Sequence, residues 1–94
     1  LVFRVSGKSM EPHILHGDVV ICSEDWTGIE TNGKIMAFRT WEGITLKKLV
    51  EDHKNRVTWL MPINHEFTPM PYTEDGEDIT MIGILDIAIR SFNR

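Results

Sequence analysis

The chain has 94 residues, of which 41% are hydrophobic and 26% are charged, a composition typical of a soluble globular domain. Its 10 basic and 14 acidic residues give a net charge of −4, which argues against direct binding to a phosphate backbone. No apolar stretch approaches the roughly 20 residues that a membrane helix needs, so we expect a cytoplasmic protein without membrane contact. The single cysteine, Cys22, excludes an internal disulfide and is expected to be a small buried apolar residue.

The hydrophobic pattern predicts a mainly β domain of short strands separated by turns. The expected strands cover residues 2–5, 18–23, 33–39, 44–51, 57–61 and 79–89, with a hairpin between the third and the fourth. Residues 8–17 lack strand alternation, so we expect a turn followed by about one turn of helix. The proline-rich segment 62–72 predicts loops and an edge strand, and Gly83 is the expected bend of the last strand. The whole of 1–94 is expected to form one small, partly rolled β domain.

The histidines do not form a recognisable metal-binding pattern. They are His13, His16, His53 and His65. Only His13 and His16 are close in sequence, and no Cys pair or His-Glu-x-x-His spacing accompanies them. We therefore expect exposed or locally hydrogen-bonded histidines, with no metal and no cofactor. A Ser–His–acid triad is also not indicated, because the chain has no Gly-x-Ser-x-Gly elbow.

Ser9 is a candidate nucleophile within the segment Ser-Gly-Lys-Ser-Met-Glu-Pro at 6–12. It follows the first expected strand, and Gly7 allows the chain to turn sharply just before it. Backbone N–H groups at the start of the following turn can point at one spot, as an oxyanion requires. A serine hydroxyl needs a base to remove its proton, and a neutral lysine can serve as that base.

Two adjacent lysines, Lys47 and Lys48, lie in the apolar strand expected at 44–51. Burial among apolar groups lowers a lysine pKa by about 3–5 units, which favours the neutral amine. Alternation places Lys47 on the same face as Thr45, whose hydroxyl can orient the amine. The chemistry alone leaves open which lysine is the base, and a lysine pair that protects a strand edge from aggregation is the alternative.

Four segments in order carry a resemblance over nearly the whole chain. They are 6–12 with Gly-Asp-Val-Val at 17–20, Gly-Lys-Ile at 33–35 with Gly-Ile-Thr-Leu-Lys-Lys-Leu at 43–49, Leu-Met-Pro-Ile-Asn-His-Glu-Phe-Thr-Pro at 60–69, and the strand 83–90. Together they closely resemble the LexA, UmuD and phage-repressor family of self-cleaving Ser–Lys peptidases. The resemblance implies a mainly β structure of the LexA/signal-peptidase type.

The resemblance also assigns roles to individual residues. The family's catalytic lysine follows a Thr-apolar dipeptide, which selects Lys47 as the general base for Ser9. The backbone N–H groups of Ser9 and Met10 are the implied oxyanion hole, and Thr45 is the expected neighbour of the lysine. Self-cleaving members cut an Ala-Gly or Cys-Gly bond some tens of residues before the nucleophile. No such pair occurs before Ser9 and the first residue is Leu1, so we expect the cleavage site in an upstream segment of a longer protein.

The function implied by the resemblance is that of the C-terminal self-cleavage and dimerisation domain of a LexA-like or phage-type transcriptional repressor. The expected partners are a second copy of the chain, its own upstream linker as the substrate, and a recombinase filament on single-stranded DNA. DNA itself would be bound only through a separate N-terminal domain. A UmuD-like accessory subunit of an error-prone DNA polymerase is one alternative, and a non-catalytic dimerisation module with the same fold is another.

Overall fold

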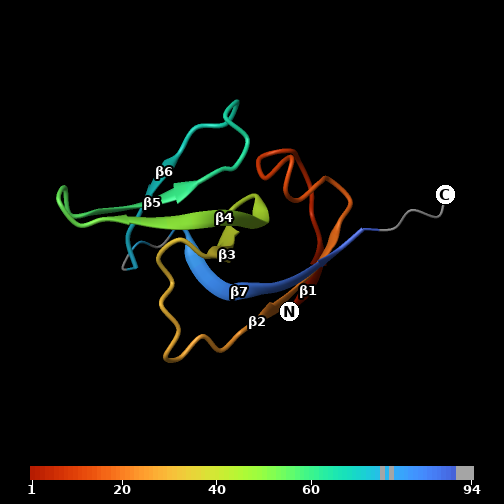
Figure 1. The fold of residues 1–94 in the computed structure, drawn as a ribbon, viewed down its shortest axis with the longest axis horizontal. Coiled ribbons are helices and arrows are strands. Elements are labelled where there is room, and N and C mark those ends of the chain that lie inside the picture. The colour runs from red at the N-terminus through yellow and green to blue at the C-terminus, as the bar shows by residue number, and fades with distance from the viewer. Residues whose placement is uncertain (75, 77, 91–94) are drawn as a thin grey trace.

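Seven strands form one antiparallel sheet in the computed structural model, which describes residues 1–74, 76 and 78–90 (Figure 1). The strands are β1 (Val2–Arg4), β2 (Val19–Ser23), β3 (Ile35–Thr40), β4 (Gly43–Asp52), β5 (Val57–Met61), β6 (Met70–Tyr72) and β7 (Thr80–Ile89). Their order across the sheet is β1-β2-β7-β3-β4-β5-β6. The last strand of the chain therefore lies between the second and the third, and it joins two halves of the sheet.

The predicted mainly β fold is confirmed, and each expected strand is present with small differences at its ends. β3 and β4 form the expected hairpin, and β6 is an edge strand in the proline-rich segment. Residues 8–17 connect β1 to β2 through turns. The expected helical turn is limited there to one hydrogen bond of α-helical spacing, from the N–H of Ile14 to the carbonyl of Met10 (3.0 Å). Nowhere in 1–74, 76 and 78–90 does the chain form a helix that is long and apolar enough to cross a membrane.

β7 bends near Gly83, as the sequence predicts. The pairing between β7 and β3 shifts register next to this residue, so that Ile82 has no partner on β3. A Cβ on residue 83 would lie 3.1 Å from the Cβ of Cys22 and 3.1 Å from the carbonyl oxygen of Ser23. Any other residue here would push β2 and β7 slightly apart, so glycine favours their close approach. The curved β7 in Figure 1 crosses from one half of the sheet to the other.

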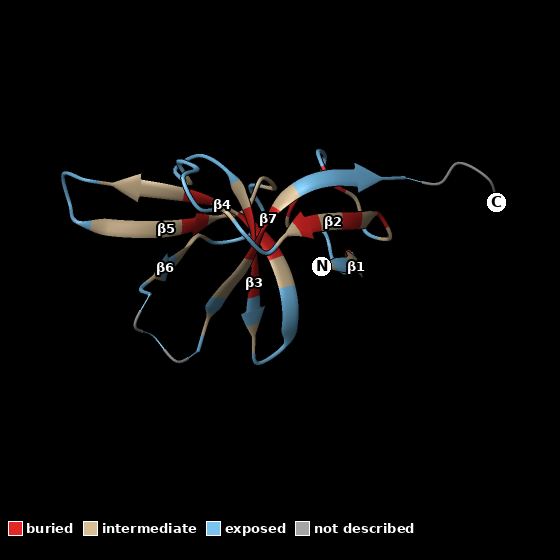
Figure 2. Ribbon diagram, turned by 90° about the horizontal axis from the view of Figure 1, so that it is seen from below, coloured by how far each residue is buried: buried red, intermediate tan, exposed pale blue. Residues whose placement is uncertain are grey.

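The core consists of two clusters of buried side chains on the two faces of the β3–β4 hairpin. One cluster is made of Val5, Met10, Ile14, Val20, Cys22, Ala37 and Leu46, and the other of Met36, Phe38, Leu49, Leu60 and Ile84. The alternation of Met36, Ala37 and Phe38 along β3 divides these residues between the two faces. Figure 2 shows the buried residues where β2, β3, β4 and β7 meet, whereas the outer half of β7 is exposed. The β3–β4 hairpin is therefore covered by buried side chains on both of its faces.

Candidate active site

The loop that carries Ser9 is held by hydrogen bonds on both sides. Gly7 has a φ of 94°, a conformation that favours glycine, and this turns the chain just before Ser9. The N–H of Gly7 donates to Nδ1 of His16 (3.0 Å), which closes the loop across its base. The N–H of Val5 donates to the carbonyl of Asp18 (2.8 Å), where β1 leads into the loop. The sequence folds this way because Gly7 supplies the turn and the neighbouring strands fix both ends.

Lys47 lies on β4 with only 8% of its surface exposed. Its neighbour on β3 is Met36, which is fully buried. The amine donates three hydrogen bonds, to Oγ of Ser9 (3.0 Å), to Oγ1 of Thr45 (2.8 Å) and to the carbonyl of Leu46 (3.2 Å). Burial lowers the pKa of the Lys47 amine below its usual value of 10.5, because the charged form loses water that three neutral acceptors replace only in part.

The structure thus brings together three of the side chains that the sequence singles out: Ser9, Lys47 and Thr45. Met10 follows Ser9 and is almost completely buried in the core, so the loop is anchored directly behind the hydroxyl group. Lys48 points to the other face of β4, is half-buried, and has Ile35 and Met61 as its neighbours on the adjacent strands. The chemistry of the strand alone left open which of the two lysines lies beside Ser9. The geometry of the hairpin places Lys47 there.

The N–H groups of Ser9 and Met10 are the expected oxyanion hole. Within the part of the chain that the structure describes, neither N–H donates a hydrogen bond to another residue. In contrast, the next N–H along the chain, that of Glu11, donates to the carbonyl of Lys8 (3.2 Å). An oxyanion hole needs donors that are not committed to another residue, and the N–H groups of Ser9 and Met10 meet this condition within the described chain.

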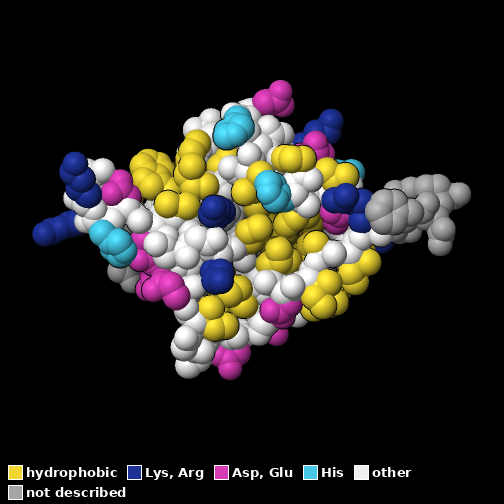
Figure 3. Space-filling view, viewed as in Figure 1, with side chains coloured by type: hydrophobic (Ala, Val, Ile, Leu, Met, Phe, Trp, Pro, Cys, Tyr) yellow, Lys and Arg dark blue, Asp and Glu magenta, His cyan; other side chains and the backbone are white. Residues whose placement is uncertain are grey.

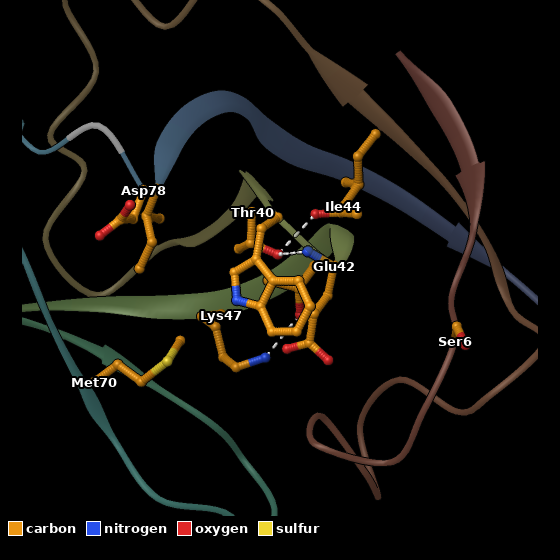
Figure 4. A pocket seen from close by; sticks show the side chains of 11 residues that line it. Ser6, Thr40, Glu42, Ile44, Lys47, Met70 and Asp78 are labelled. Atoms are coloured by element: carbon orange, nitrogen blue, oxygen red, sulfur yellow. Dashed lines mark hydrogen bonds between the residues drawn. The ribbon is translucent and has the colours of Figure 1, made fainter.

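A cleft of about 450 Å³ opens beside Lys47 (Figure 4). Its walls are the turn of the β3–β4 hairpin, the start of β6, the residues before β7 and, on the opposite side, the loop after β1. The side chains that line it include Trp41, Glu42, Ile44, Met70, Asp78 and Ile79. Ser6, Ile44 and Thr45 border both this cleft and the small cavity next to Ser9. Figure 4 shows Lys47 between Met70 and Asp78 on one side and Ser6 on the other, so the Lys47 side chain lies within the cleft.

The alternative chemistries find little support in the geometry. The described residues contain no group of three or more His, Cys, Asp and Glu side chains that could hold a metal ion. His16 accepts a hydrogen bond from the backbone, and Nε2 of His53 lies 3.3 Å from a carboxylate oxygen of Glu51. Cys22 is buried in the core as predicted, and burial raises the pKa of its thiol. Within the described part of the chain, no hydrogen bond joins a histidine or the thiol to Ser9.

Asn64 is a site residue to which sequence reasoning gave no role. It lies in the loop between β5 and β6, where its backbone N–H donates to the carbonyl of Ser9 (2.9 Å). Its side-chain Nδ2 donates to the carbonyl of Lys8 (2.9 Å). The available signal was its place in the segment Leu-Met-Pro-Ile-Asn at 60–64, which belongs to the resemblance but carries no ionisable group.

An all-β fold with a buried lysine facing a serine beside a peptide-sized cleft defines a class of small β-sheet serine peptidase domains. The model of the Peptidase S24-like family matches residues 1–86, so this chain belongs to the Peptidase S24-like family. Two curated relatives, each a LexA repressor from a strain of Acidithiobacillus ferrooxidans, are 28% identical over 85 residues. The match covers 89% of this chain and 40% of each relative, so the chain spans about two-fifths of their length. The predicted membership of the LexA-like family is confirmed.

Proposed function

We propose that this chain is the C-terminal self-cleavage and dimerisation domain of a LexA-like or phage-type transcriptional repressor. It would hydrolyse one peptide bond with Ser9 as the nucleophile and Lys47 as the general base. The observation that carries the proposal is the hydrogen bond of 3.0 Å between a buried lysine amine and the hydroxyl of a serine. The family match and the LexA repressor relatives support the same conclusion.

The chemistry follows from this pair. Neutral Lys47 takes the proton of the Ser9 hydroxyl, and Oγ forms a bond to the carbonyl carbon of the substrate. The N–H groups of Ser9 and Met10 stabilise the resulting oxyanion. The C–N bond then breaks, and the protonated Lys47 returns its proton to the leaving amine. An acyl-enzyme ester remains on Ser9.

A water molecule completes the reaction. Lys47, neutral again, takes a proton from the water as its oxygen bonds to the acyl carbon. The second oxyanion occupies the same N–H groups, and its collapse breaks the bond to Oγ of Ser9. Ser9 regains a proton from Lys47, and the product leaves with a new carboxyl group. Thr45 keeps the amine in place through both halves, because its hydroxyl accepts a hydrogen bond from the amine (2.8 Å).

The proposed substrate is the chain's own upstream linker, seated in the cleft beside Lys47. The cleft has a size suited to a few residues of extended peptide, and Trp41, Ile44, Met70 and Ile79 give it apolar walls. The linker would enter between the β3–β4 turn and the loop after β1, since these two segments form opposite walls. Cleavage would separate this domain from an N-terminal DNA-binding domain. The two DNA-binding domains of a dimer would then no longer be linked, and the gain in effective concentration that dimerisation gives them would be lost.

Dimerisation through the outer half of β7 is part of the proposal. Leu85 and residues 87–89 pair with β2 on one side, whereas the pairing of β7 with β3 ends at Ile84. Ile87 and Ile89 in this half are about 50% exposed. An unpaired strand side with exposed apolar residues is suited to pairing with a second copy. The further partners that we propose are a recombinase filament on single-stranded DNA as the inducer and DNA through the N-terminal domain, all in the cytoplasm.

The test is self-cleavage of the full-length protein at mildly alkaline pH, where more Lys47 is neutral. The wild type is compared with Ser9→Ala, Lys47→Ala and, as a matched control, Lys48→Ala on the other face of the same strand. We expect one cut upstream of Leu1, detected as two fragments by mass spectrometry, in the wild type and Lys48→Ala only. If the wild type stays intact even with a recombinase filament, the chain is a dimerisation module without this activity. Cleavage in Ser9→Ala would assign the reaction to other residues.

A further inference from the structure

Asn64 connects the loop between β5 and β6 to the two peptide groups on either side of Ser9. Its backbone N–H binds the carbonyl of Ser9, and its side-chain amide binds the carbonyl of Lys8, each at 2.9 Å. The amide is itself oriented, because Oδ1 accepts a hydrogen bond from the N–H of Glu66 (3.0 Å). Asn64 is far from Ser9 in the sequence, so this contact forms only when the sheet has folded.

The two carbonyls that Asn64 binds belong to the peptide groups that also carry the expected oxyanion donors. The carbonyl of Lys8 shares a peptide plane with the N–H of Ser9, and the carbonyl of Ser9 shares one with the N–H of Met10. The cis peptide bond of the described chain is Glu11–Pro12, so both of these groups are trans. In a trans peptide group the C=O and N–H bonds point in opposite directions. A residue that holds both carbonyls on one side therefore directs both N–H groups to the other side.

We propose that Asn64 is a positioning residue that sets the oxyanion hole of this peptidase, an inference that rests on the proposed function. The N–H groups of Ser9 and Met10 donate to no residue within the described part of the chain, so hydrogen bonds to the two carbonyls fix the rotation of the peptide planes. Glu11 also donates to the carbonyl of Lys8 (3.2 Å), whereas Asn64 binds both carbonyls. Asn64 anchors both planes through their carbonyls before the substrate arrives. Donors that are oriented in advance cost no reorganisation in the transition state, which is the main source of oxyanion stabilisation.

The loop environment explains why an asparagine performs this task. The residue must donate from its backbone and from its side chain in nearly the same direction, with an acceptor left to fix the amide. A short side chain with one N–H₂ and one oxygen meets all three requirements. The carbonyl of Asn64 also accepts from the N–H of Phe67 (3.1 Å), which stabilises the turn that presents the amide.

The experiment compares Asn64→Ala and Asn64→Leu with the wild-type full-length protein. Both variants keep the backbone N–H and lose two side-chain hydrogen bonds, the one to the carbonyl of Lys8 and the one from the N–H of Glu66. The matched control is Asn32→Ala, which also removes one side-chain hydrogen bond to the backbone, from the N–H of Glu51, but lies away from the site. The rate of self-cleavage is measured across pH, the melting temperature of each variant is recorded, and labelling of Ser9 by a fluorophosphonate is followed in parallel.

We expect the plateau rate at alkaline pH to fall about 10- to 100-fold in both Asn64 variants, while the pH midpoint set by Lys47 stays the same. Labelling of Ser9 should slow in proportion, because the reagent also develops an oxyanion. The melting temperature should fall only a few degrees further than in Asn32→Ala, because one more side-chain hydrogen bond is lost.

Two results would overturn the inference. One is a plateau rate of self-cleavage that stays at the wild-type value in both Asn64 variants. The other is a lowered rate that comes with a shifted midpoint or a much lower melting temperature, which would indicate loss of the fold or of the lysine environment. A wild-type protein that neither cleaves nor labels at Ser9 would instead refute the proposed function, and the positioning role with it.

Discussion

Arg90 holds the carboxylate of Asp18 with two hydrogen bonds of 3.0 Å, and so joins the end of β7 to the end of the loop that carries Ser9. Asp18 is 3% exposed and also accepts a hydrogen bond from the N–H of Leu15 (2.8 Å). The hydrogen bonds from Arg90 hold the pKa of the Asp18 carboxyl below its usual value of 3.8. Asp18, the second residue of the Gly-Asp pair at 17–18, therefore connects the loop that carries Ser9 to the end of β7 through Arg90.

The ion pair between Arg90 and Asp18 predicts that the stability of the fold depends on pH. A lowered carboxyl pKa in the folded state adds stability that is fully present above the ordinary value of 3.8 and is lost as the pH falls through the lowered pKa. Asp18→Asn should lower the melting temperature by several degrees at pH 5–7, and the difference from the wild type should shrink below about pH 4. Thermal unfolding followed by circular dichroism measures this, with Asp86→Asn on the exposed part of β7 as the control. A difference in melting temperature between the wild type and Asp18→Asn that stays constant down to pH 2 would contradict a lowered pKa of Asp18.

Lys47 predicts a second rise of stability with pH, in the alkaline range. Its folded-state pKa is lowered by burial, so the unfolded chain binds more protons between that pKa and 10.5. The stability of the wild type must therefore rise with pH across this window. Compared with Lys47→Met, which keeps the length of the side chain without the charge, the wild type should gain stability as the pH increases from 7 to 10. Urea unfolding at a series of pH values measures the difference, and parallel curves for the two proteins would show that the amine is not desolvated.

Thr45 is expected to control the pH at which cleavage begins. Its hydroxyl accepts a hydrogen bond from the Lys47 amine (2.8 Å) and so favours the charged form. In Thr45→Val the pKa of Lys47 should fall further, so the rate should reach its midpoint at a lower pH. The plateau should also decrease about tenfold, because the amine loses one of its three anchors. Thr45→Ser keeps the hydroxyl and serves as the control, and a midpoint that moves to higher pH in Thr45→Val would refute this role.

Trp41 tests whether the cleft holds the substrate. It is 87% exposed at the turn of the β3–β4 hairpin and lines the cleft, so the fold does not depend on it. Trp41→Ala should change the free energy of unfolding by no more than about 0.5 kcal/mol, whereas KM for a peptide cleaved in trans should rise about tenfold. Trp59→Ala is the matched control, since Trp59 lines a separate groove over β4 and β5. That control should lower stability and leave KM unchanged, and an equal effect of both variants on KM would argue against the cleft.

The surface around the site agrees with a peptide substrate rather than a nucleic acid. Figure 3 shows hydrophobic side chains near the middle of this face, where β4 and the loop after β1 lie in Figure 1, with basic groups scattered among them. Two acidic side chains, Glu42 and Asp78, line the cleft itself. A phosphate backbone would meet repulsion there, whereas an extended peptide with apolar side chains would not.

The strands were predictable from the sequence because each is a run of β-branched or apolar residues between turn-forming residues. β2, for example, follows Gly17 and Asp18 and consists of Val, Val, Ile, Cys and Ser. The position of β7 between β2 and β3 was not predictable. Several edges of similar length and hydrophobicity compete for it, and the choice depends on close packing at Gly83 that has no sequence periodicity.

The candidate site was predictable in part. Strand alternation placed Thr45 beside Lys47, but only the resemblance selected Lys47 over Lys48 and paired it with Ser9. Asn64 could not be found by the same route, because its contribution is the direction of two backbone carbonyls. Such a contact depends on the geometry of a loop that is remote in sequence, and an uncharged side chain gives no electrostatic signal.

The position of β7 has a consequence for the order in which the protein emerges from the ribosome. The strand pairings that connect the half carrying Ser9 to the half carrying Lys47 run through β7, which is synthesised after the other six strands. A nascent chain that ends before Thr80 has both residues of the pair but lacks the strand that aligns them. Under the proposed function, we therefore expect a chain stalled at this point to remain uncut until β7 has been added.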